Sequence, residues 1–475
     1  MNTLDRKSPT PLSDQIEAQL QEQIASGRLL AGARLVSMRR LASQLGVSVQ
    51  TVVVAYDKLA ASGAIESRGT SGFFVCGPRE PLEPEDALLE ASDEQDAVWL
   101  VQQANDQRAG MLLVGSGTLP AAWLLDAVPA SCLQRAMARS SAGLASRCPP
   151  QGLPELRAGI AHLLRGQGLS VDPNRLLTTL GSTQAIDLIC RAFLKPGDAV
   201  LVEDPGYFLM FDRLRRAGVR VVPVARRPDG LDLEQLEAAC REERPRLLFM
   251  QAVLHNPTGW GSSPANLHRV LSLAQRHGVL IAEDDAQGHF HAGHATRLAA
   301  LAGLEQVIYY SSFCKAVSPA LRVGYMAAEP TLLKALMREK IHAMMTMPAL
   351  NEYVMLEVLA AGRWRKHLDR LHGRLDAARL ACASRLSEAG MRFEHAGEGL
   401  FLWGRVPDGV DVELLAQDAL RNKIVLARGS AFGIGPTLRS YLRFNAVSAQ
   451  HPRLAAYLGE RFKALAGARA LMGVG

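Results

Sequence analysis

Between residues 176 and 326 the sequence alternates short apolar runs with amphipathic segments of helical period. This alternation predicts a mostly parallel β-sheet that is covered by helices on both faces. The expected strands are 176–179, 199–203, 219–224, 247–252, 279–283, 307–310 and 322–326, and the expected helices are 183–193, 208–217, 233–241 and 264–277. Ligands of such sheets bind at the carboxyl ends of the strands. The side chains that follow each strand are therefore the candidate site.

One lysine, Lys315, lies between the last two expected strands. A buried lysine is costly unless it is neutral or paired, and a neutral amine is a nucleophile that forms Schiff bases. Ser312 and Arg322 flank it and can bind an oxyanion. The alternative for this segment alone is a surface loop with ordinary charges.

Four other strand ends carry groups that suit one planar, phosphorylated ligand. Helix N-terminal amides bind phosphate, an aromatic side chain covers a ring, an amide donates to a phenolic oxygen, and a carboxylate keeps a ring nitrogen protonated. Gly181, Ser182 and Thr183 supply the helix N-terminus for the phosphate, and Tyr207 supplies the aromatic side chain. Asn256 supplies the amide and Asp284 the carboxylate. Read singly, they are ordinary helix caps and turn residues. Read with Lys315, they specify pyridoxal 5′-phosphate (PLP).

Residues 1–77 show a different pattern of expected secondary structure. Helical spacing predicts helices at 11–24, at 38–45 after Ser37, and between Ser48 and Gly63, followed by short strands at 64–67 and 72–76. This order, a helix, a helix–turn–helix and a hairpin, is typical of winged helix-turn-helix DNA-binding domains. The alternative is a helical dimerisation module without DNA affinity.

Residues 78–110 are rich in proline and acidic residues, which predicts a solvated linker. We therefore expect an α/β protein in three parts: a DNA-binding domain at 1–77, the linker at 78–110, and a body at 111–475. Within the body, the large domain is expected to end at about residue 330 and a smaller α/β domain to follow from about 331.

Charge and composition limit the partners that the protein can bind and the compartment in which it is expected. The net charge of +6 permits a polyanion partner without establishing one. The seven scattered cysteines and the absence of an apolar signal core predict a reduced, cytoplasmic protein, and no apolar stretch reaches the length of a membrane span. His289, His291 and His294 share one loop, but no ligand at a characteristic spacing accompanies them, so we predict no metal site.

The N-terminal module resembles the GntR family of bacterial transcription regulators. The matching motifs are Pro11-Leu-Ser-Asp-Gln, Ser37-Met-Arg-Arg-Leu-Ala, Leu45-Gly-Val-Ser and Ser71-Gly-Phe-Phe-Val. This resemblance implies DNA contacts from Arg39, Ser48, Gln50, Thr51, Ser71 and Gly72. Val49 stands where the family usually has an arginine, which removes a likely base or phosphate contact.

The body resembles the fold-type I aminotransferases through Gly152-Leu-Pro-Glu-Leu-Arg, Asn256-Pro-Thr-Gly, Glu283-Asp-Asp and the segment from Ser311 to Gly324. The resemblance implies that Lys315 forms the Schiff base with PLP and that Arg443 grips the carboxylate of an amino-acid substrate. The other implied cofactor contacts are Asp284 at the ring nitrogen, Asn256 at the phenolic oxygen, Tyr207 stacked on the ring, and Ser182, Thr183, Ser312 and Arg322 at the phosphate.

The body also departs from its family. Ala286 and Gln287 occupy the positions where a tyrosine usually donates to the phenolic oxygen of the cofactor. Loss of that phenol is expected to raise the pKa of the Schiff base and to weaken proton-transfer chemistry. Gln287 is a candidate replacement donor.

In its order of domains the whole chain resembles the MocR subfamily of bacterial regulators. This resemblance implies a transcription regulator that binds a double-stranded DNA operator, senses PLP or an amino compound, and forms a head-to-tail homodimer. The alternative is a working aminotransferase with a secondary DNA-binding head, with residual or half-reaction activity at most expected. The sequence names neither the operator nor the effector, nor the direction of regulation.

Overall fold

The computed structural model describes residues 4–6, 8–69, 72–76, 102, 110–140, 147–360, 362–395 and 397–472. The chain forms two compact units, Met1–Glu94 and Gln95–Gly475, and each is described by itself. Most of the expected linker, 78–110, lies outside the described residues. No helix within the described ranges is both long enough and apolar enough to cross a membrane.

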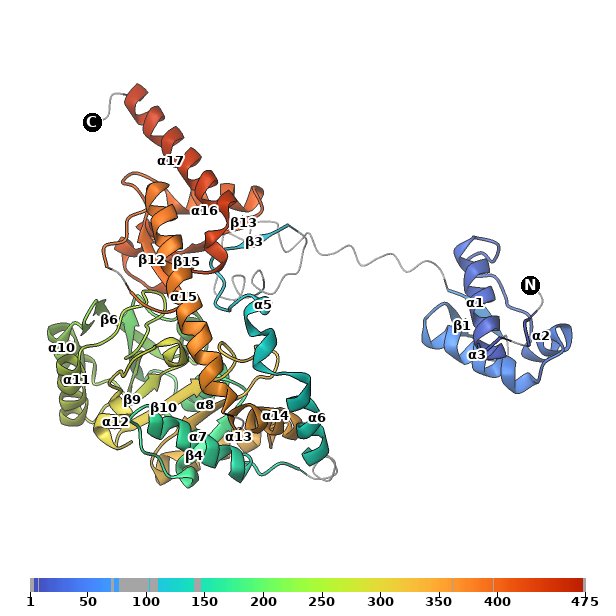
Figure 1. Ribbon diagram of the computed structural model, residues 1–475, viewed down its shortest axis with the longest axis horizontal. Helices are drawn as coiled ribbons and strands as arrows, with labels where there is room; N and C mark the ends of the chain where they lie inside the picture. The colour runs from blue at the N-terminus through green and yellow to red at the C-terminus, as the bar shows by residue number, and fades with distance from the viewer. Residues whose placement is uncertain are drawn as a thin grey trace. The chain divides into compact units, whose positions relative to one another are not determined.

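The first unit has the expected order of elements (Figure 1). Its elements are α1 (Leu12–Ala25), α2 (Met38–Leu45), α3 (Val49–Ala61), β1 (Ile65–Ser67) and β2 (Phe73–Val75), and the two strands pair antiparallel. Gly46, with φ 62°, ends α2 in the left-handed region, which lets the chain turn within three residues into α3. Ser48 caps α3 by accepting from the Thr51 amide at 3.1 Å. Ser37 precedes α2 as expected, but its side chain makes no capping hydrogen bond.

The second unit is built on an eight-stranded sheet in the order β4-β11-β10-β9-β8-β5-β6-β7. Strands β10, β9, β8, β5 and β6 are parallel, whereas β11 is antiparallel to both neighbours and β7 is antiparallel to β6. The bounds are β4 Leu176–Thr179, β5 Ala199–Asp204, β6 Arg220–Arg227, β7 Gly230–Leu231, β8 Leu247–Met250, β9 Leu280–Asp284, β10 Val307–Ser312 and β11 Gly324–Ala327. Each expected strand is present, and β7 is an addition that the sequence did not predict.

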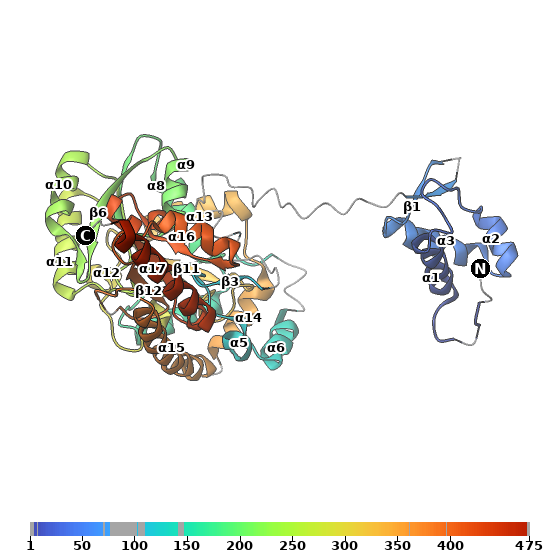
Figure 2. The ribbon, with the colours of Figure 1, turned by 90° about the horizontal axis from the view of Figure 1, so that it is seen from above.

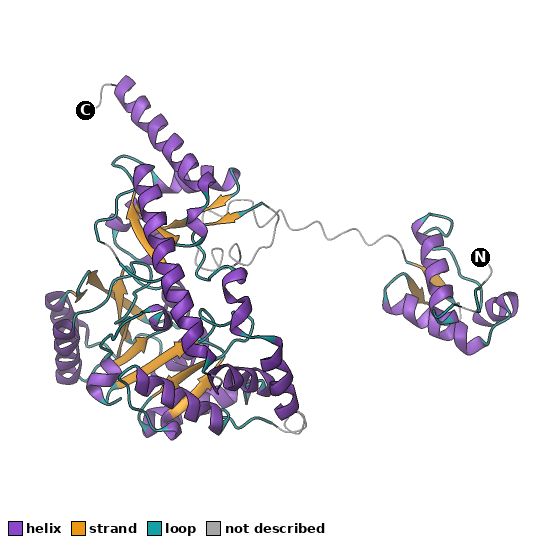
Figure 3. Cartoon of the chain, viewed as in Figure 1, coloured by secondary structure: helices purple, strands orange, loops and turns teal. Residues whose placement is uncertain are grey.

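Helices cover both faces of this sheet, as its doubly buried strands require (Figure 3). Successive residues of β8 alternate between the faces: Leu247 and Phe249 pack with α8, α9 and α13, whereas Leu248 and Met250 pack with the core that includes α7, α10 and α11. The helices are α5 Ala121–Leu124, α6 Ala130–Ser140, α7 Pro154–Gly166, α8 Ser182–Phe193, α9 Phe208–Arg216, α10 Leu233–Glu243, α11 Pro264–His277, α12 Leu298–Ala302, α13 Pro330–Met344 and α14 Ala349–Ala360.

A smaller α/β layer follows at the C-terminal end, and the long helix α15 (Arg363–Glu388) runs into it from the large sheet (Figures 1 and 2). Its sheet has the order β12-β15-β14, and β13 pairs in parallel with β3. The remaining elements are β3 Leu112–Leu113, β12 Phe401–Arg405, α16 Val412–Arg421, β13 Ile424–Val425, β14 Ala427–Arg428, β15 Tyr441–Asn445 and α17 Pro452–Met472. Short 3₁₀ turns lie at Leu125–Ala127, Pro173–Arg175, Gly288–Phe290, Gly429–Phe432, Pro436–Ser440 and Ser448–Gln450.

The division within the body differs from the expected boundary at about residue 330. Helices α13 and α14 pack against α8 and α7, so they belong to the large sheet although they follow residue 330. Conversely, β3 precedes the large sheet in the chain but pairs with β13 of the smaller layer. Pairing across more than 300 residues leaves no local signal, which is why the sequence did not reveal it.

Candidate functional site

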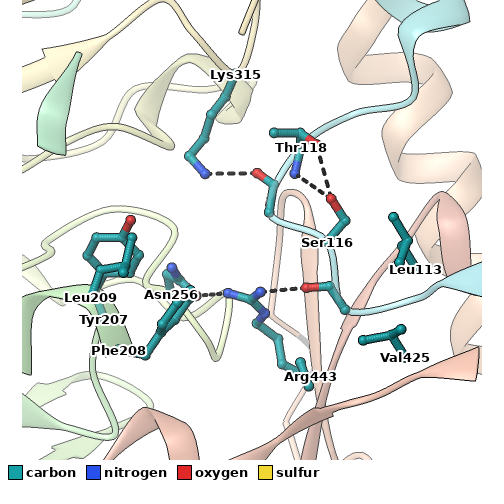
Figure 4. A pocket seen from close by; sticks show the side chains of 13 residues that line it. Leu113, Ser116, Thr118, Tyr207, Phe208, Leu209, Asn256, Lys315, Val425 and Arg443 are labelled. Carbon is teal, nitrogen blue, oxygen red and sulfur yellow. Dashed lines mark hydrogen bonds between the residues drawn. The ribbon is translucent and has the colours of Figure 1, made fainter. Parts of the chain in front are cut away.

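A cavity of about 150 Å³ opens where strand ends of the large sheet face the smaller layer (Figure 4). Four of its polar lining residues come from distant parts of the chain: Lys315 after β10, Asn256 after β8, Tyr207 before α9, and Arg443 on β15. These four residues were predicted as site residues, and the fold brings them together. The carboxyl ends of neighbouring parallel strands share one sheet edge, which accounts for the convergence of the first three.

Lys315 is the only lysine in the lining of this cavity. Its Nζ donates to the Gly117 carbonyl at 2.8 Å and lies 6.0 Å from the centre of the Phe401 ring. Burial, reinforced by the Arg443 guanidinium, lowers the Lys315 pKa to about 8, although Asp284 opposes the shift. At pH 7 about a tenth of this amine is therefore unprotonated and nucleophilic.

Asp284 is the last residue of β9 and is buried. Its Oδ1 accepts from the Ala286 amide at 2.9 Å, and Gln251 also hydrogen-bonds to the carboxylate. Burial raises the Asp284 pKa to about 6, and the hydrogen bonds and Lys315 counter part of that rise. A buried carboxylate of this kind is stabilised by a cationic N–H partner.

Gly181, Ser312 and Arg322 converge at the N-terminus of α8. Gly181 precedes the helix with φ 86°, and no side chain caps the helix. A Cβ at Gly181 would lie 3.0 Å from Arg322 Nη2, 3.2 Å from Cys314 Sγ and 3.4 Å from Ser312 Oγ. Ser182 and Thr183 form the first turn of the helix, so their amides point out of its N-terminus. Uncapped amides beside a guanidinium and a hydroxyl form a cradle for a phosphate group.

Tyr207 and Asn256 lie between this cradle and Arg443. The Tyr207 ring contacts Phe208 edge-on, its hydroxyl is hydrogen-bonded to Thr183, and burial raises its pKa to about 12, so it stays neutral. The backbone N–H of Asn256 donates to Gln251 Oε1 at 2.7 Å, which fixes the turn after β8. Figure 4 shows the Asn256 side-chain nitrogen pointing away from Arg443, where it can donate to a ligand.

Arg443 is buried in the middle of β15 and is surrounded by aromatic rings. Its guanidinium carbon lies 4.3 Å from the Phe401 ring centre and 4.6 Å from that of Phe432. It donates to Asn256 Oδ1 at 2.7 Å and to the Gly115 carbonyl at 2.6 Å. Among the described residues no carboxylate pairs with it, and burial lowers its pKa to about 9. A buried cation held only by neutral groups is a receptor for an anionic ligand.

The sequence analysis missed the segment from Leu113 to Thr118, which forms one wall of the cavity. Asn445 holds this segment by donating to the carbonyls of Ser116 at 2.9 Å and Thr118 at 2.8 Å. At Gly115, a Cβ would lie 2.4 Å from the Ala427 Cβ, so only glycine permits this approach. In the sequence, the two glycines at 115 and 117 were a weak indication that the backbone approaches another segment closely here. Gln251, which orients both Asn256 and Asp284, was also missed.

The two residues that replace the expected tyrosine are both buried. Neither side-chain amide atom of Gln287 has a hydrogen-bond partner among the residues that the structure describes. An unpartnered buried amide is costly. Ala286 has no side-chain donor, so Gln287 is the only one of the two that can replace a phenol.

The three loop histidines do not form a common site. His289 is buried and stacks on Phe313 at 5.4 Å, whereas His291 lies 3.5 Å from the Glu398 carboxylate. Across the described parts of the chain, no group of three or more histidine, cysteine or acidic side chains is arranged to hold a metal ion.

These residues fit PLP, the cofactor that the sequence specified. The observation that carries the fit is the cradle at Gly181, because it can hold a phosphate while Lys315 and Asp284 lie at neighbouring strand ends. The buried Arg443, which has no carboxylate partner among the described residues, adds a separate place for a carboxylate.

In the first unit, Arg39, Ser48, Gln50 and Gly72 are placed as expected around the helix–turn–helix and its hairpin. Arg39, Ser48 and Gln50 are exposed, and Thr51 bonds to Ser48 at 2.8 Å through its hydroxyl. Gly72 ends the hairpin turn with φ 99°, a conformation that favours glycine. Ser71 lies outside the described residues.

Each of the two units matches a known family. Residues 109–458 match the family model of aminotransferase class I and II, and residues 12–75 match that of the bacterial regulatory proteins of the gntR family. A transcriptional regulator of Escherichia coli, YdcR, is 28% identical over 91% of this chain and 94% of its own length. The probable rhizopine catabolism regulatory protein MocR of Rhizobium meliloti is 29% identical over 78% of this chain and 76% of its own length.

Aminotransferases are also similar to this chain. The 2-aminoadipate transaminase of Thermus thermophilus is 32% identical over 69% of this chain and 83% of its own length. The crystal structure of LysN, an α-aminoadipate aminotransferase of Thermus thermophilus complexed with N-(5′-phosphopyridoxyl)-L-leucine, superposes with a TM-score of 0.69 at 28% identity. That superposition covers 80% of this chain and 97% of the enzyme.

Proposed function

Because this chain belongs to the aminotransferase class I and II family and carries a gntR-family DNA-binding domain ahead of it, we propose that its body senses PLP or an amino compound and controls DNA binding by the head. It is a MocR-type regulator in its domain composition. The observation that carries the proposal is a ligand site on the same chain as a winged helix, in which a buried arginine has no carboxylate partner among the described residues.

PLP is the cofactor of the body. When bound, it supplies an aldehyde that condenses with an amine and a ring that withdraws electrons. Lys315 supplies the amine, Asp284 the negative charge at the ring nitrogen, Asn256 a donor to the phenolic oxygen, and Tyr207 the stacking face. The phosphate ligands are Gly181, Ser182, Thr183, Ser312 and Arg322.

Arg443 receives the carboxylate of the amino compound. In the structure its Nη1 donates to Asn256 Oδ1 and its Nη2 to the Gly115 carbonyl, both neutral acceptors that a carboxylate can outcompete. Displacement of these contacts would remove one restraint on the segment 113–118 and one on the side chain of Asn256. Allostery requires that the effector bind one arrangement better than another, and this exchange of partners is a source of such a difference.

The head binds double-stranded DNA. Arg39 neutralises a phosphate, Ser48 and Thr51 position the N-terminus of α3, and Gln50 contacts a base edge, while Ser71 and Gly72 place the hairpin on the backbone or minor groove. Such a protein works in the compartment that holds its operator, so we place it in the cytoplasm of a bacterial cell.

The working form is a homodimer with a head-to-tail arrangement. Support comes from apolar side chains on α6, α13, α14 and the turn after α13: Leu133, Met137, Ile341, Met345 and Leu350 are between 36% and 62% exposed. Helix α6 packs on α14, which follows α13 in the chain. Sedimentation of the full chain tests this, and a monomer at micromolar concentration would contradict it.

The central test is fluorescence anisotropy of the full chain on the DNA upstream of its own gene. We expect preference over scrambled DNA, a salt-dependent affinity, and a change of affinity when PLP or an amino acid is added. The variant Arg39→Ala should bind more weakly, whereas Arg28→Ala, an exposed arginine outside the proposed contacts, should not. Equal binding to scrambled DNA at all salt concentrations would refute the proposal.

A second candidate function is transamination, favoured by the 32% identity to a transaminase and by Arg443 in the site. Incubation of the PLP-loaded protein with L-2-aminoadipate and other amino acids tests it. Formation of a keto acid with repeated turnover would establish an enzyme. A single conversion without turnover would be the residual half-reaction expected from the Gln287 substitution.

A further inference from the structure

Helix α3 presents valines to solvent. Val49 is 44% exposed and Val54 is 36% exposed, while Val53 between them is partly buried. Val52, Ala55, Tyr56 and Leu59 of the same helix are buried in the core of the head. The exposed valines are therefore surplus to the fold. At about 100° per residue, Val49 and Val54 lie about 140° apart around α3 and bound one solvent-facing side of it, which a partner with apolar groups can cover.

Helix α2, which packs on α3, is cationic at its N-terminus. Arg39 and Arg40 lie in the first turn of α2, both exposed, and that turn has no acidic residue. The side chain of Ser37 leaves the helix N-terminus uncapped, so its positive end adds to the two guanidinium groups. Arginines at a helix N-terminus repel the helix dipole unless an anion lies between them. Phosphate of a nucleic-acid backbone satisfies both groups at once.

The centre of the surface also contains one exposed amide, Gln50. Glutamine pairs with adenine in the major groove through two hydrogen bonds. The partner of adenine, thymine, carries the C5-methyl, an apolar group in that groove that valine can cover. Gln50 and Val54 are one helical turn apart, about 6 Å, close to the distance between bases two steps apart along a strand, about 7 Å.

We propose that α3 reads adenine–thymine pairs, with Gln50 on an adenine edge and Val49 and Val54 on thymine methyl groups. This rests on the proposed DNA-binding function and deepens it, because it assigns the chemical class of the operator. The valine at position 49, where its relatives by resemblance have arginine, then exchanges a charged contact for an apolar one.

The experiment replaces thymine by deoxyuridine, which removes only the C5-methyl. An operator is first selected with the full chain from random double-stranded DNA, and each thymine is then substituted in turn. Burial of one methyl is worth about 0.8 kcal/mol, or about a fourfold change in affinity. We expect about a threefold to fivefold loss at one or more thymines in each half-site, and no loss elsewhere.

Variants assign the contact to named side chains. In Val49→Ala and Val54→Ala the deoxyuridine effect should vanish at the matching thymine, while Val49→Thr keeps one methyl and should retain part of it. Leu30→Ala is the control, because Leu30 is 70% exposed in the same unit and outside the proposed surface. It should leave the effect unchanged.

The outcomes separate this inference from the proposed function. Selective binding with no deoxyuridine effect at any thymine would overturn the inference and leave the regulator intact. A change of oligomeric mass in the valine variants, with DNA affinity unchanged, would assign the valines to a protein interface and also overturn it. Binding without any sequence preference would refute both.

Discussion

Arg443 and Asn256 are joined by a hydrogen bond of 2.7 Å, although 187 residues separate them in the chain. One lies on a strand of the smaller layer and the other follows a strand of the large sheet. The bond therefore couples the proposed carboxylate receptor to a proposed cofactor contact. If both roles hold, we expect an effector that engages Arg443 to alter the cofactor site directly.

The first prediction concerns the carboxylate. Arg443→Lys removes the bidentate fork but keeps the charge, and should weaken amino-acid binding by about 10- to 100-fold, as expected for loss of one charge-assisted hydrogen bond. PLP binding should persist. Absorbance titration of the PLP-loaded protein with amino acids measures both. Arg421→Lys, an exposed arginine at the end of α16, is the control. Unchanged amino-acid affinity in Arg443→Lys would remove this arginine from the effector site.

The second prediction concerns Lys315 and pH. With a pKa of about 8, about a tenth of this amine is unprotonated at pH 7, against about 0.03% at the usual lysine value. The rate of PLP incorporation into the apo-protein should rise with pH and level off above about 8. Stopped-flow absorbance follows this. Lys315→Ala should abolish the Schiff-base absorbance and exposed Lys334→Ala should retain it. A midpoint near 10 would contradict the burial argument.

The third prediction concerns Gln287. Gln287→Tyr places a phenol where the resemblance expects one, and its hydrogen bond favours the deprotonated Schiff base. The midpoint of the absorbance change with pH should fall by about one unit, the equivalent of one hydrogen bond to a charged group. Gln287→Phe has the same bulk without the hydroxyl and should not lower the midpoint. Equal midpoints in these two variants would show that position 287 does not face the phenolic oxygen.

The fourth prediction concerns a buried ion pair beneath the site. Arg226 Nη1 lies 2.7 Å from the Glu203 carboxylate, and both side chains are almost wholly buried. Glu203→Ala leaves an uncompensated buried cation and should lower the free energy of unfolding of the body by about 3–5 kcal/mol. Asp212→Ala breaks the more exposed pair with Arg216 and should cost less than about 1 kcal/mol. Urea denaturation compares the two, and equal midpoints would contradict the argument.

The fifth prediction separates the two kinds of DNA contact. Arg39→Ala should weaken binding to all sequences alike and reduce the slope of log affinity against log salt by about one, because one phosphate contact is lost. Gln50→Ala should leave the slope unchanged and relax preference at one base pair, at a cost of about 1–3 kcal/mol. Anisotropy titrations at several salt concentrations measure both. If Arg39→Ala changed preference rather than slope, its assignment to a phosphate would be wrong.

The sequence predicted most of the architecture because its signals are local. Period-two and period-3.6 patterns identified the strands and helices within a few residues, and α2, α11 and β4 have the predicted bounds. The family was predicted from motifs of both units and the cofactor from residues at strand ends, and both predictions are confirmed. The roles of the individual site residues stay predictions, although the fold brings the cofactor set together.

What the sequence alone determined about this protein is its pair of folds and its cofactor, because these depend on short-range periodicity and on residue types at strand ends. Only the tertiary structure decided that β3 pairs with β13, that the segment 113–118 walls the cavity, and that Arg443 is buried without a carboxylate partner among the described residues. Contacts between residues hundreds of positions apart leave no periodic trace. They arise only when packing brings the two ends of the body together, and they determine what the site can bind.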